Sequence, residues 1–131
     1  MQIDIVTLFP EMFPGVLSAS ILNRAQQSGR LVVRVRDLRD YTHDNRRTVD
    51  DRPYGGGPGM VMKVEPIFEA VEDVKRSCGQ HKSCETILMS PQGERLCPSL
   101  AKRLADREHL LLICGHYEGV DERVKPLIAR T

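Results

Sequence analysis

The sequence has no tryptophan, few aromatic residues and almost no net charge, because 19 Lys and Arg side chains face 18 Asp and Glu side chains. A balance this close gives no global electrostatic argument for nucleic-acid binding, so an RNA site would have to depend on local features. No apolar run approaches the roughly 20 residues of a membrane-spanning helix. The first residues, MQIDIVTLFP, lack a basic segment followed by a long apolar stretch, so they do not indicate a secretory signal. These absences favour a cytoplasmic protein that does not enter a membrane.

Cysteine is also scarce, with four residues in the chain. The spacing Cys78-x2-His81-x2-Cys84 offers thiolate and imidazole, which are zinc ligand types, but a closed structural site needs four ligands. Nothing in the spacing adds Cys97 or His109 to this group. We therefore interpret the segment as a polar connection between a helix and a strand, with reduced thiols, and predict no metal site.

Standard nucleotide-binding motifs are missing as well. The chain contains no G-x-x-x-x-G-K-[ST] sequence, so no P-loop is indicated. Its glycine cluster, in DDRPYGGGPGM at Asp50–Met60, does not fit G-x-G-x-x-G and follows no predicted strand directly. A flexible linker would not need the aspartates or the tyrosine of this run, so we interpret it as part of a structured loop.

The rest of the chain alternates strand patterns with helix patterns. Strands are predicted at 2–8, 31–38, 86–89 and 109–114, and helices at about 11–28, from about 66, from 98 and from about 121. The second helix carries an apolar stripe that includes Phe68, and the third is expected to turn Leu100, Ala101 and Leu104 inward. Pro126 is expected to interrupt the last helix.

Strands that are apolar on both faces and alternate with helices indicate a parallel sheet flanked by helices. The predicted fold class is therefore α/β, in one domain without an internal boundary. Between the second strand and the second helix, residues 39–63 show no sustained pattern. Loops of this length are uncommon in compact domains unless they are functional or disordered, and the mixed composition favours a structured loop.

Two short loops begin where predicted strands end. SPQG (90–93) follows one strand and GHYEG (115–119) follows another, and ligands of open parallel sheets bind beyond the carboxyl ends of the strands. SPQG offers a hydroxyl, an amide and exposed backbone, which suit a purine edge, but a simple turn would also explain it. GHYEG places a carboxylate, an imidazole and a phenol between two glycines, which exceeds what a turn needs. Adjacent strands would bring the two loops side by side.

The charged part of the long loop allows two interpretations. Four arginines between Arg39 and Arg52 are balanced by four aspartates, so the segment is either a solvated, self-paired loop or a phosphate-contacting loop whose arginines the aspartates orient. The residues alone do not decide between them, and they do not give the reaction.

Four segments together resemble one family. LFPEMF, RDYTHDNRRTVDDRPYGGGPGM, MSPQG and CGHYEGVDERV are similar to the TrmD family of bacterial tRNA (guanine-N1)-methyltransferases, of the SPOUT class, whose α/β fold contains a trefoil knot. The resemblance runs nearly end to end. It implies methyl transfer from S-adenosyl-L-methionine to N1 of the guanosine 3′-adjacent to the tRNA anticodon (position 37), by a homodimer with its active sites at the interface.

The resemblance also implies roles for particular residues. The adenosine part of the cofactor would contact Leu88, Met89, Ser90, Pro91, Gln92 and Gly93, and a second wall would be formed by Gly115, Tyr117, Glu118 and Gly119. The active-site loop would include Asp50, Arg52, Tyr54, Gly55, Pro58 and Gly59. Glu118 is expected to support catalysis near the guanine or the cofactor rather than to act as the general base. Many relatives carry arginine where this chain has His116.

The family's general-base aspartate, a third glycine-rich cofactor loop and a helical tRNA-binding domain would lie beyond residue 131. Residues 1–131 are thus expected to be the N-terminal part of the cofactor-binding domain, with an incomplete knot, no C-terminal tRNA-binding domain and no activity on their own. Two alternatives stay open: a SPOUT methyltransferase acting on another RNA, and a non-catalytic RNA-binding or dimerisation domain.

Overall fold

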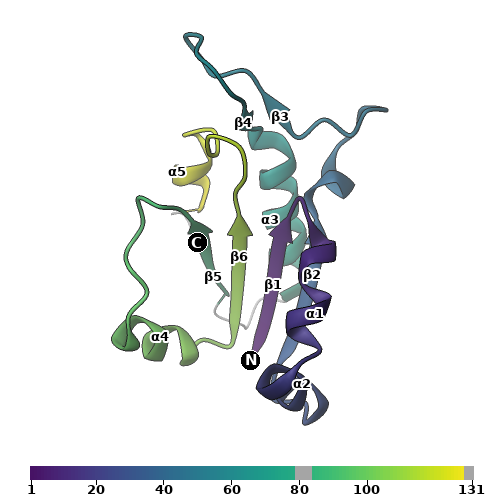
Figure 1. Cartoon of the computed structure of the whole chain (residues 1–131), viewed down its shortest axis with the longest axis vertical. Coiled ribbons are helices and arrows are strands. Elements are labelled where there is room, and N and C mark those ends of the chain that lie inside the picture. The colour runs from purple at the N-terminus through teal and green to yellow at the C-terminus, as the bar shows by residue number, and fades with distance from the viewer. Residues whose placement is uncertain (79–83, 129–131) are drawn as a thin grey trace.

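The computed structural model describes residues 1–78 and 84–128. Its centre is a four-stranded sheet in the order β2-β1-β6-β5 with all neighbours parallel (Figure 1). The strands are β1 (Gln2–Thr7), β2 (Val32–Asp37), β5 (Cys84–Met89) and β6 (His109–Cys114). The predicted α/β class and parallel sheet are confirmed. The trefoil knot and the division into domains remain predictions.

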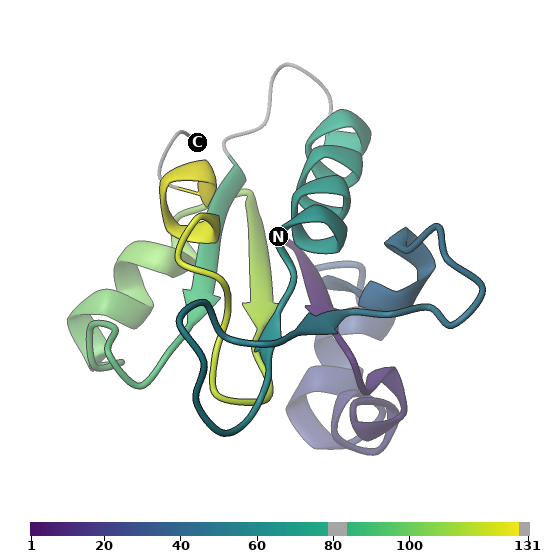
Figure 2. The ribbon, with the colours of Figure 1, turned by 90° about the horizontal axis from the view of Figure 1, so that it is seen from above.

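Helices cover the sheet on both faces (Figure 2). The long α3 (Val64–Cys78) and the short α5 (Val124–Ile128) lie on one face, and α1 (Pro14–Leu17), α2 (Ser20–Gln27) and α4 (Pro98–Ala105) lie on the other. Two 3-10 turns, η1 (Pro10–Met12) and η2 (Leu38–Tyr41), follow β1 and β2. No helix in the described part of the chain is long and apolar enough to cross a membrane.

The core lies between α3 and the sheet. Val6, Leu111 and Ile113 point from the strands toward Ile67 and Val74 of α3, and all five are almost fully buried. The apolar strand runs and the helical stripe therefore meet as the sequence pattern predicts. Burial of such side chains stabilises the fold by about 1.5–3 kcal/mol each.

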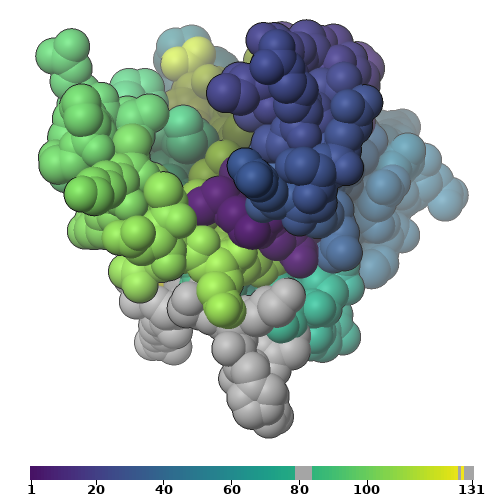
Figure 3. All heavy atoms as spheres, turned by 90° about the horizontal axis from the view of Figure 1, so that it is seen from below, coloured from purple at the N-terminus to yellow at the C-terminus, as the bar shows by residue number. Residues whose placement is uncertain are grey.

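The opposite face is more open. Helices α1, α2 and α4 contain no fully buried residue, and Val16 and Ile21 are 65% and 75% exposed. Seen from below, the atoms of α4 stand apart from those of α1 and α2, with the strands between them (Figure 3). This face is therefore covered less completely than the face under α3.

The single helix predicted for about 11–28 is wrong, because the segment forms η1, α1 and α2. Pro14 has no backbone N–H, so it begins a helix rather than continuing one. Ala19 is extended, and Ser20 has a positive φ of 49°, which separates α1 from α2. Only the proline was readable from the sequence.

Three smaller predictions about helices also differ from the structure. Phe68 is 43% exposed although it lies near the apolar stripe of α3, and Ala101 of α4 is exposed rather than turned inward. The last helix begins at Val124, not near Asp121, and Pro126 lies in its first turn. Proline is tolerated there because the N–H groups of a first turn have no helical acceptor.

A polar network centred on Asp4 and His109 lies toward the amino ends of β1 and β6 and is joined by Arg36 from β2. Asp4 of β1 and His109 of β6 have no solvent exposure, and His109 Nε2 donates to Asp4 Oδ2 at 2.8 Å. Arg36 of β2 donates to Asp4 Oδ1 at 2.7 Å and to Asp73 of α3 at 2.8 Å. Burial raises the pKa of Asp4, but hydrogen bonds from Gln2, Arg36 and His109 outweigh it and hold the pKa below its ordinary value. The network ties three strands to α3.

Candidate functional site

The loops after β5 and β6 lie side by side at the carboxyl edge of the sheet. The two strands pair in parallel, with Met89 opposite Cys114, so both chains leave the sheet at the same level. A cavity of about 370 Å³ lies between the loops. This volume is within the range of small-ligand pockets. The predicted meeting of SPQG and GHYEG is confirmed.

Most of the residues predicted to bind cofactor line this cavity. The predicted residues in its wall are Leu88, Met89, Ser90, Pro91, Gln92, Gly115, Tyr117, Glu118 and Gly119. Gly93 is not in the wall; its N–H donates to the Ser90 carbonyl at 3.1 Å and closes the turn. Contact with a cofactor remains a prediction for all of them.

The cavity wall combines apolar surface with acidic groups. Met89 is 54% exposed at the strand end, and Leu88 and Val120 add further apolar surface. Glu118 and Glu122 line the same space, and so does Lys125, whose ammonium pairs with the Glu122 carboxylate at 2.8 Å. Apolar surface beside the acidic Glu118 suits a ligand with a flat apolar part and a positive charge.

Backbone conformation shapes the second wall. Tyr117 has a positive φ of 57° and Gly119 a φ of 133°. Glycine adopts the second value without strain, whereas a residue with Cβ would not. Glu118 lies between these two residues, and its N–H donates to the Met60 carbonyl at 3.1 Å.

Gly59 of the long loop packs directly on Glu118. A Cβ atom at residue 59 would overlap Glu118 Cγ, and the backbone φ of Gly59 is +86°. Glycine is therefore required here twice, for close approach and for conformation. The contact fixes the predicted active-site loop against the GHYEG turn.

Met62 completes this attachment. Its N–H donates to the Gly119 carbonyl at 2.9 Å, and its own carbonyl accepts from Asp121 N at 3.0 Å. Its sulfur accepts the His116 N–H at 3.1 Å, and the side chain is fully buried. The loop from β3 (Asp50–Asp51) to β4 (Val61–Met62) is thus a structured hairpin beside the pocket, as the mixed composition predicts.

The other predicted loop residues lie farther from the main cavity. Asp50 pairs with Met62 in the small ladder, and Gly55 and Pro58 are exposed. A second cavity of about 230 Å³ is lined by Asp51, Arg52, Tyr54, Val61, Met62, Lys63, Glu65, Asp121 and Arg123. The Arg123 guanidinium lies 5.5 Å from the centre of the Tyr54 ring, which places the loop tip against the segment after GHYEG.

The charged part of the loop is partnered within the chain at two of its arginines. Arg47 forms an ion pair with Asp40, and Arg39 donates to the Leu8 carbonyl at 2.6 Å and lies over the Phe9 ring. The Arg47–Asp40 pair agrees with both interpretations, and Arg39 binds outside the loop, so the choice between a self-paired and a phosphate-contacting loop stays a prediction.

Three pocket residues were missing from the sequence prediction: Val120, Glu122 and Lys125. His116 was predicted as part of the GHYEG loop but not as a cofactor contact. Glu122 lies just before α5 and Lys125 lies in it. This helix packs against β5, so no motif adjacent to a strand end marks the two residues. The helical spacing of the two residues was the only available signal. His81, the middle residue of the Cys78-x2-His81-x2-Cys84 spacing, lies outside the described residues.

Fold and site together define an open parallel α/β protein with a ligand pocket at the carboxyl ends of its strands. A family model described as "tRNA (Guanine-1)-methyltransferase TrmD" matches residues 1–131. The chain therefore belongs to the TrmD family of tRNA (guanine-1)-methyltransferases.

Individual relatives agree with this assignment. The chain is 54% identical to a tRNA (guanine-N(1)-)-methyltransferase of Dictyoglomus turgidum over 130 residues, covering 99% of this chain and 51% of the relative. It is 54% identical to the one of Moorella thermoacetica, covering 95% and 50%. The crystal structure of tRNA (m1G37) methyltransferase from Aquifex aeolicus superposes with a TM-score of 0.88 at 38% identity, over 98% of this chain and 56% of that one. The chain spans about half the length of the curated relatives it matches.

Proposed function

We propose that the protein transfers a methyl group from S-adenosyl-L-methionine to N1 of the guanosine 3′-adjacent to the tRNA anticodon, in the cytoplasm. The observation that carries the proposal is the cavity between SPQG and GHYEG, in a chain of the TrmD family. Methyl transfer to a different RNA, which the sequence also allows for a SPOUT protein, has no observation in its favour.

The apolar and polar groups that line the cavity suit S-adenosyl-L-methionine. When bound, this cofactor supplies a methyl group on a positively charged sulfur, so the site needs alignment and a negative field rather than a nucleophile. Leu88 and Met89 would cover an adenine ring, Gln92 and the backbone around Gly115 would bond its edge, and Glu118 would supply negative charge. The amide and backbone groups can serve both as donors and as acceptors.

Guanine N1 carries a proton, so transfer also needs a base. We propose that Glu118 assists near the guanine, held by its backbone bond to Met60 and by its contact with Gly59. The relatives are about twice as long as this chain. We therefore propose that residues 1–131 supply two walls of the pocket, and that methyl transfer needs additional residues of such longer proteins.

Methylation of a tRNA transcript tests the reaction. The purified full-length protein, S-adenosyl-L-methionine and a transcript with guanosine after the anticodon should yield 1-methylguanosine at that position, identified by nucleoside mass spectrometry. A transcript with adenosine at that position is the matched control. Methylation at another nucleotide, or none, would contradict the assignment; methylation by a polypeptide ending at Thr131 would refute only the need for further residues.

The non-catalytic alternative makes a different prediction. An RNA-binding or dimerisation module would give no heat in isothermal titration with S-adenosyl-L-methionine, whereas the proposed pocket predicts saturable binding with one site per chain. This measurement does not depend on finding the right RNA.

We also propose that the protein is a homodimer that binds tRNA. Support for the dimer comes from the apolar side chains exposed on the first helices, including Met12, Val16 and Ile21. Large apolar side chains left exposed on neighbouring helices are a feature of protein–protein contact sites when they form one patch. Sedimentation velocity of the wild type and of Ile21→Lys tests it; a wild-type monomer at micromolar concentration would contradict it.

A further inference from the structure

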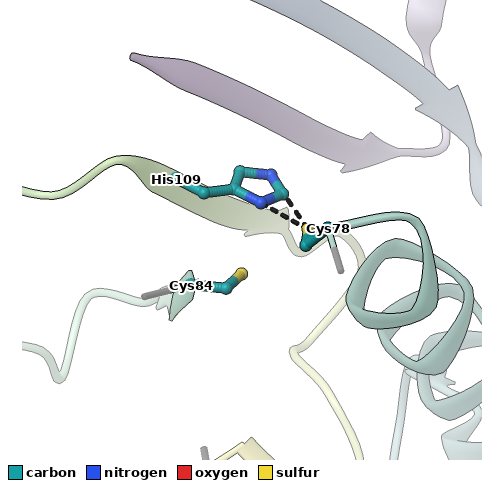
Figure 4. Close-up of side chains that lie close together, drawn as sticks. All are labelled: Cys78, Cys84 and His109. Atoms are coloured by element: carbon teal, nitrogen blue, oxygen red, sulfur yellow. Dashed lines mark hydrogen bonds between the residues drawn. The ribbon is translucent and has the colours of Figure 1, made fainter. Parts of the chain in front are cut away.

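A cluster of two thiols and an imidazole lies at the amino edge of the sheet, away from the pocket. Cys78 ends α3, Cys84 begins β5 and His109 begins β6, and their potential ligand atoms all lie within 4.8 Å of one another (Figure 4). Strands of six residues, about 20 Å long, separate this cluster from the proposed cofactor site. The proposed function makes no use of it.

His109 is arranged as a metal ligand would be. Its Nε2–H donates to the buried carboxylate of Asp4 at 2.8 Å, so Nδ1 carries a lone pair that can accept a thiol proton or bind a metal ion. Nδ1 faces Cys78 Sγ, as Figure 4 shows. A carboxylate behind the imidazole fixes its orientation and raises its basicity in metalloproteins.

The two thiols complete a soft ligand set. Cys78 Sγ is bonded to the Val74 carbonyl at 2.9 Å, and Cys84 extends from the neighbouring strand toward the same space. Burial and the nearby Cys78 raise the pKa of Cys84 to about 12, so this thiol is protonated at neutral pH unless a cation displaces the proton. Two thiolates and a neutral imidazole would balance the charge of a divalent ion.

We propose that Cys78, Cys84 and His109 bind one zinc ion. Thiolate and imidazole together select zinc over magnesium or calcium. Solvent would occupy the fourth position, so the site would be open, unlike a closed structural site with four protein ligands. Tetrahedral bonds of about 2.3 Å to sulfur and 2.0 Å to nitrogen need roughly 3.5 Å between these ligand atoms. Cys78 Sγ and His109 Nδ1, 2.5 Å apart without the ion, therefore separate by about 1 Å on binding. Both thiol protons pass to solvent.

Such an ion would join the end of α3 to the first residues of two strands. Zinc would raise the free energy of unfolding and would not change cofactor binding directly, since the proposed cofactor pocket lies at the other edge of the sheet. The three residues come from three elements, and the sequence spacing offers His81 rather than His109, so no local pattern predicts this site.

Zinc and cobalt titrations of the purified protein, kept reduced, test the proposal. We expect one zinc per chain, measured by competition with a chromogenic chelator, and a rise in melting temperature. Cobalt should give a sulfur-to-metal charge-transfer band and the visible bands of a tetrahedral site. Cys84→Ser should weaken zinc binding by more than about 10-fold and remove the charge-transfer contribution of one thiolate.

Cys114→Ser is the matched control, because Cys114 is also half-buried on the neighbouring strand but at its opposite end. It should leave zinc affinity unchanged. Equal zinc binding by the wild type and Cys84→Ser would overturn the proposal. So would a Cys78–Cys84 disulfide in the protein isolated without reductant, combined with no zinc binding after reduction.

Discussion

The two edges of the sheet are built on opposite principles. At the amino edge, polar groups are paired within the fold: Asp4 and His109 are fully buried and bonded to each other, and the partly buried Arg36 donates to Asp4. At the carboxyl edge, polar groups of SPQG and GHYEG line a cavity, and Gly59 of the long loop packs directly on Glu118. The first arrangement fixes strands in register, whereas the second leaves donors and acceptors free for a ligand. Changes at the amino edge should therefore affect stability, and changes at the carboxyl edge should affect binding.

The largest expected effect is that of Asp4→Ala. The change leaves the charge of Arg36 and the imidazole of His109 without their buried partner, which typically costs about 3–5 kcal/mol of unfolding free energy. Urea denaturation measures it. Asp73→Ala is the control, since Asp73 also binds Arg36 but its side chain is 42% exposed; its loss should cost at most about 1 kcal/mol. Equal losses for the two variants would contradict the distinction between the edges.

Gly115→Val should act on binding instead. An added Cβ at residue 115 would lie 3.7 Å from Val120 Cγ1, an ordinary contact, but the two further methyl groups of valine would enter the cavity. We expect S-adenosyl-L-methionine affinity to fall at least about 10-fold, with little change in stability. Isothermal titration measures this, and Gly115→Ala should weaken binding far less. An unchanged titration for the valine variant would count against the proposed cofactor site.

Gly59→Ala tests whether the long loop must touch Glu118. Gly56→Ala is closely matched, because Gly56 also has a positive φ (+81°) but has open space where a Cβ would lie. Both variants carry conformational strain of about 1–2 kcal/mol, and only Gly59→Ala collides with Glu118. Its tRNA methylation rate should fall about 10-fold more than that of Gly56→Ala. Similar rates would show that the contact is dispensable.

The smallest effect concerns acid stability. The pKa of Asp4 is lower in the folded protein than its ordinary value of 3.8. The stabilisation that ionised Asp4 gives to the fold is therefore complete above pH 3.8 and is lost as the pH falls through the folded pKa. Unfolding free energy should therefore decline below about pH 4, and the decline should be shallower in Asp4→Asn. Equilibrium denaturation between pH 2 and about 6 measures the slope. Equal slopes would contradict the assignment to Asp4.

The carboxyl edge was largely predictable from the sequence, and the amino edge was not. SPQG and GHYEG each adjoin an apolar strand, so their meeting follows from strand pairing alone. The Asp4–His109 bond joins opposite ends of the chain, and no local pattern marks an aspartate inside β1 as a partner for a histidine at the start of β6. Glu122 and Lys125 were missed for a related reason, because the direction in which α5 returns to the pocket depends on packing rather than on its own residues. Ser20 shows the same limit at the level of the backbone, since nothing in SASILN predicts its positive φ.

Hydrogen–deuterium exchange with and without S-adenosyl-L-methionine tests the central claim most directly, because it reports both edges in one experiment on the purified protein. The account predicts slower exchange at residues 88–93 and 115–120 on adding the cofactor, and unchanged exchange at residues 2–4 and 109–111. Protection confined to the amino edge, or no protection in either loop at a saturating concentration, would contradict it.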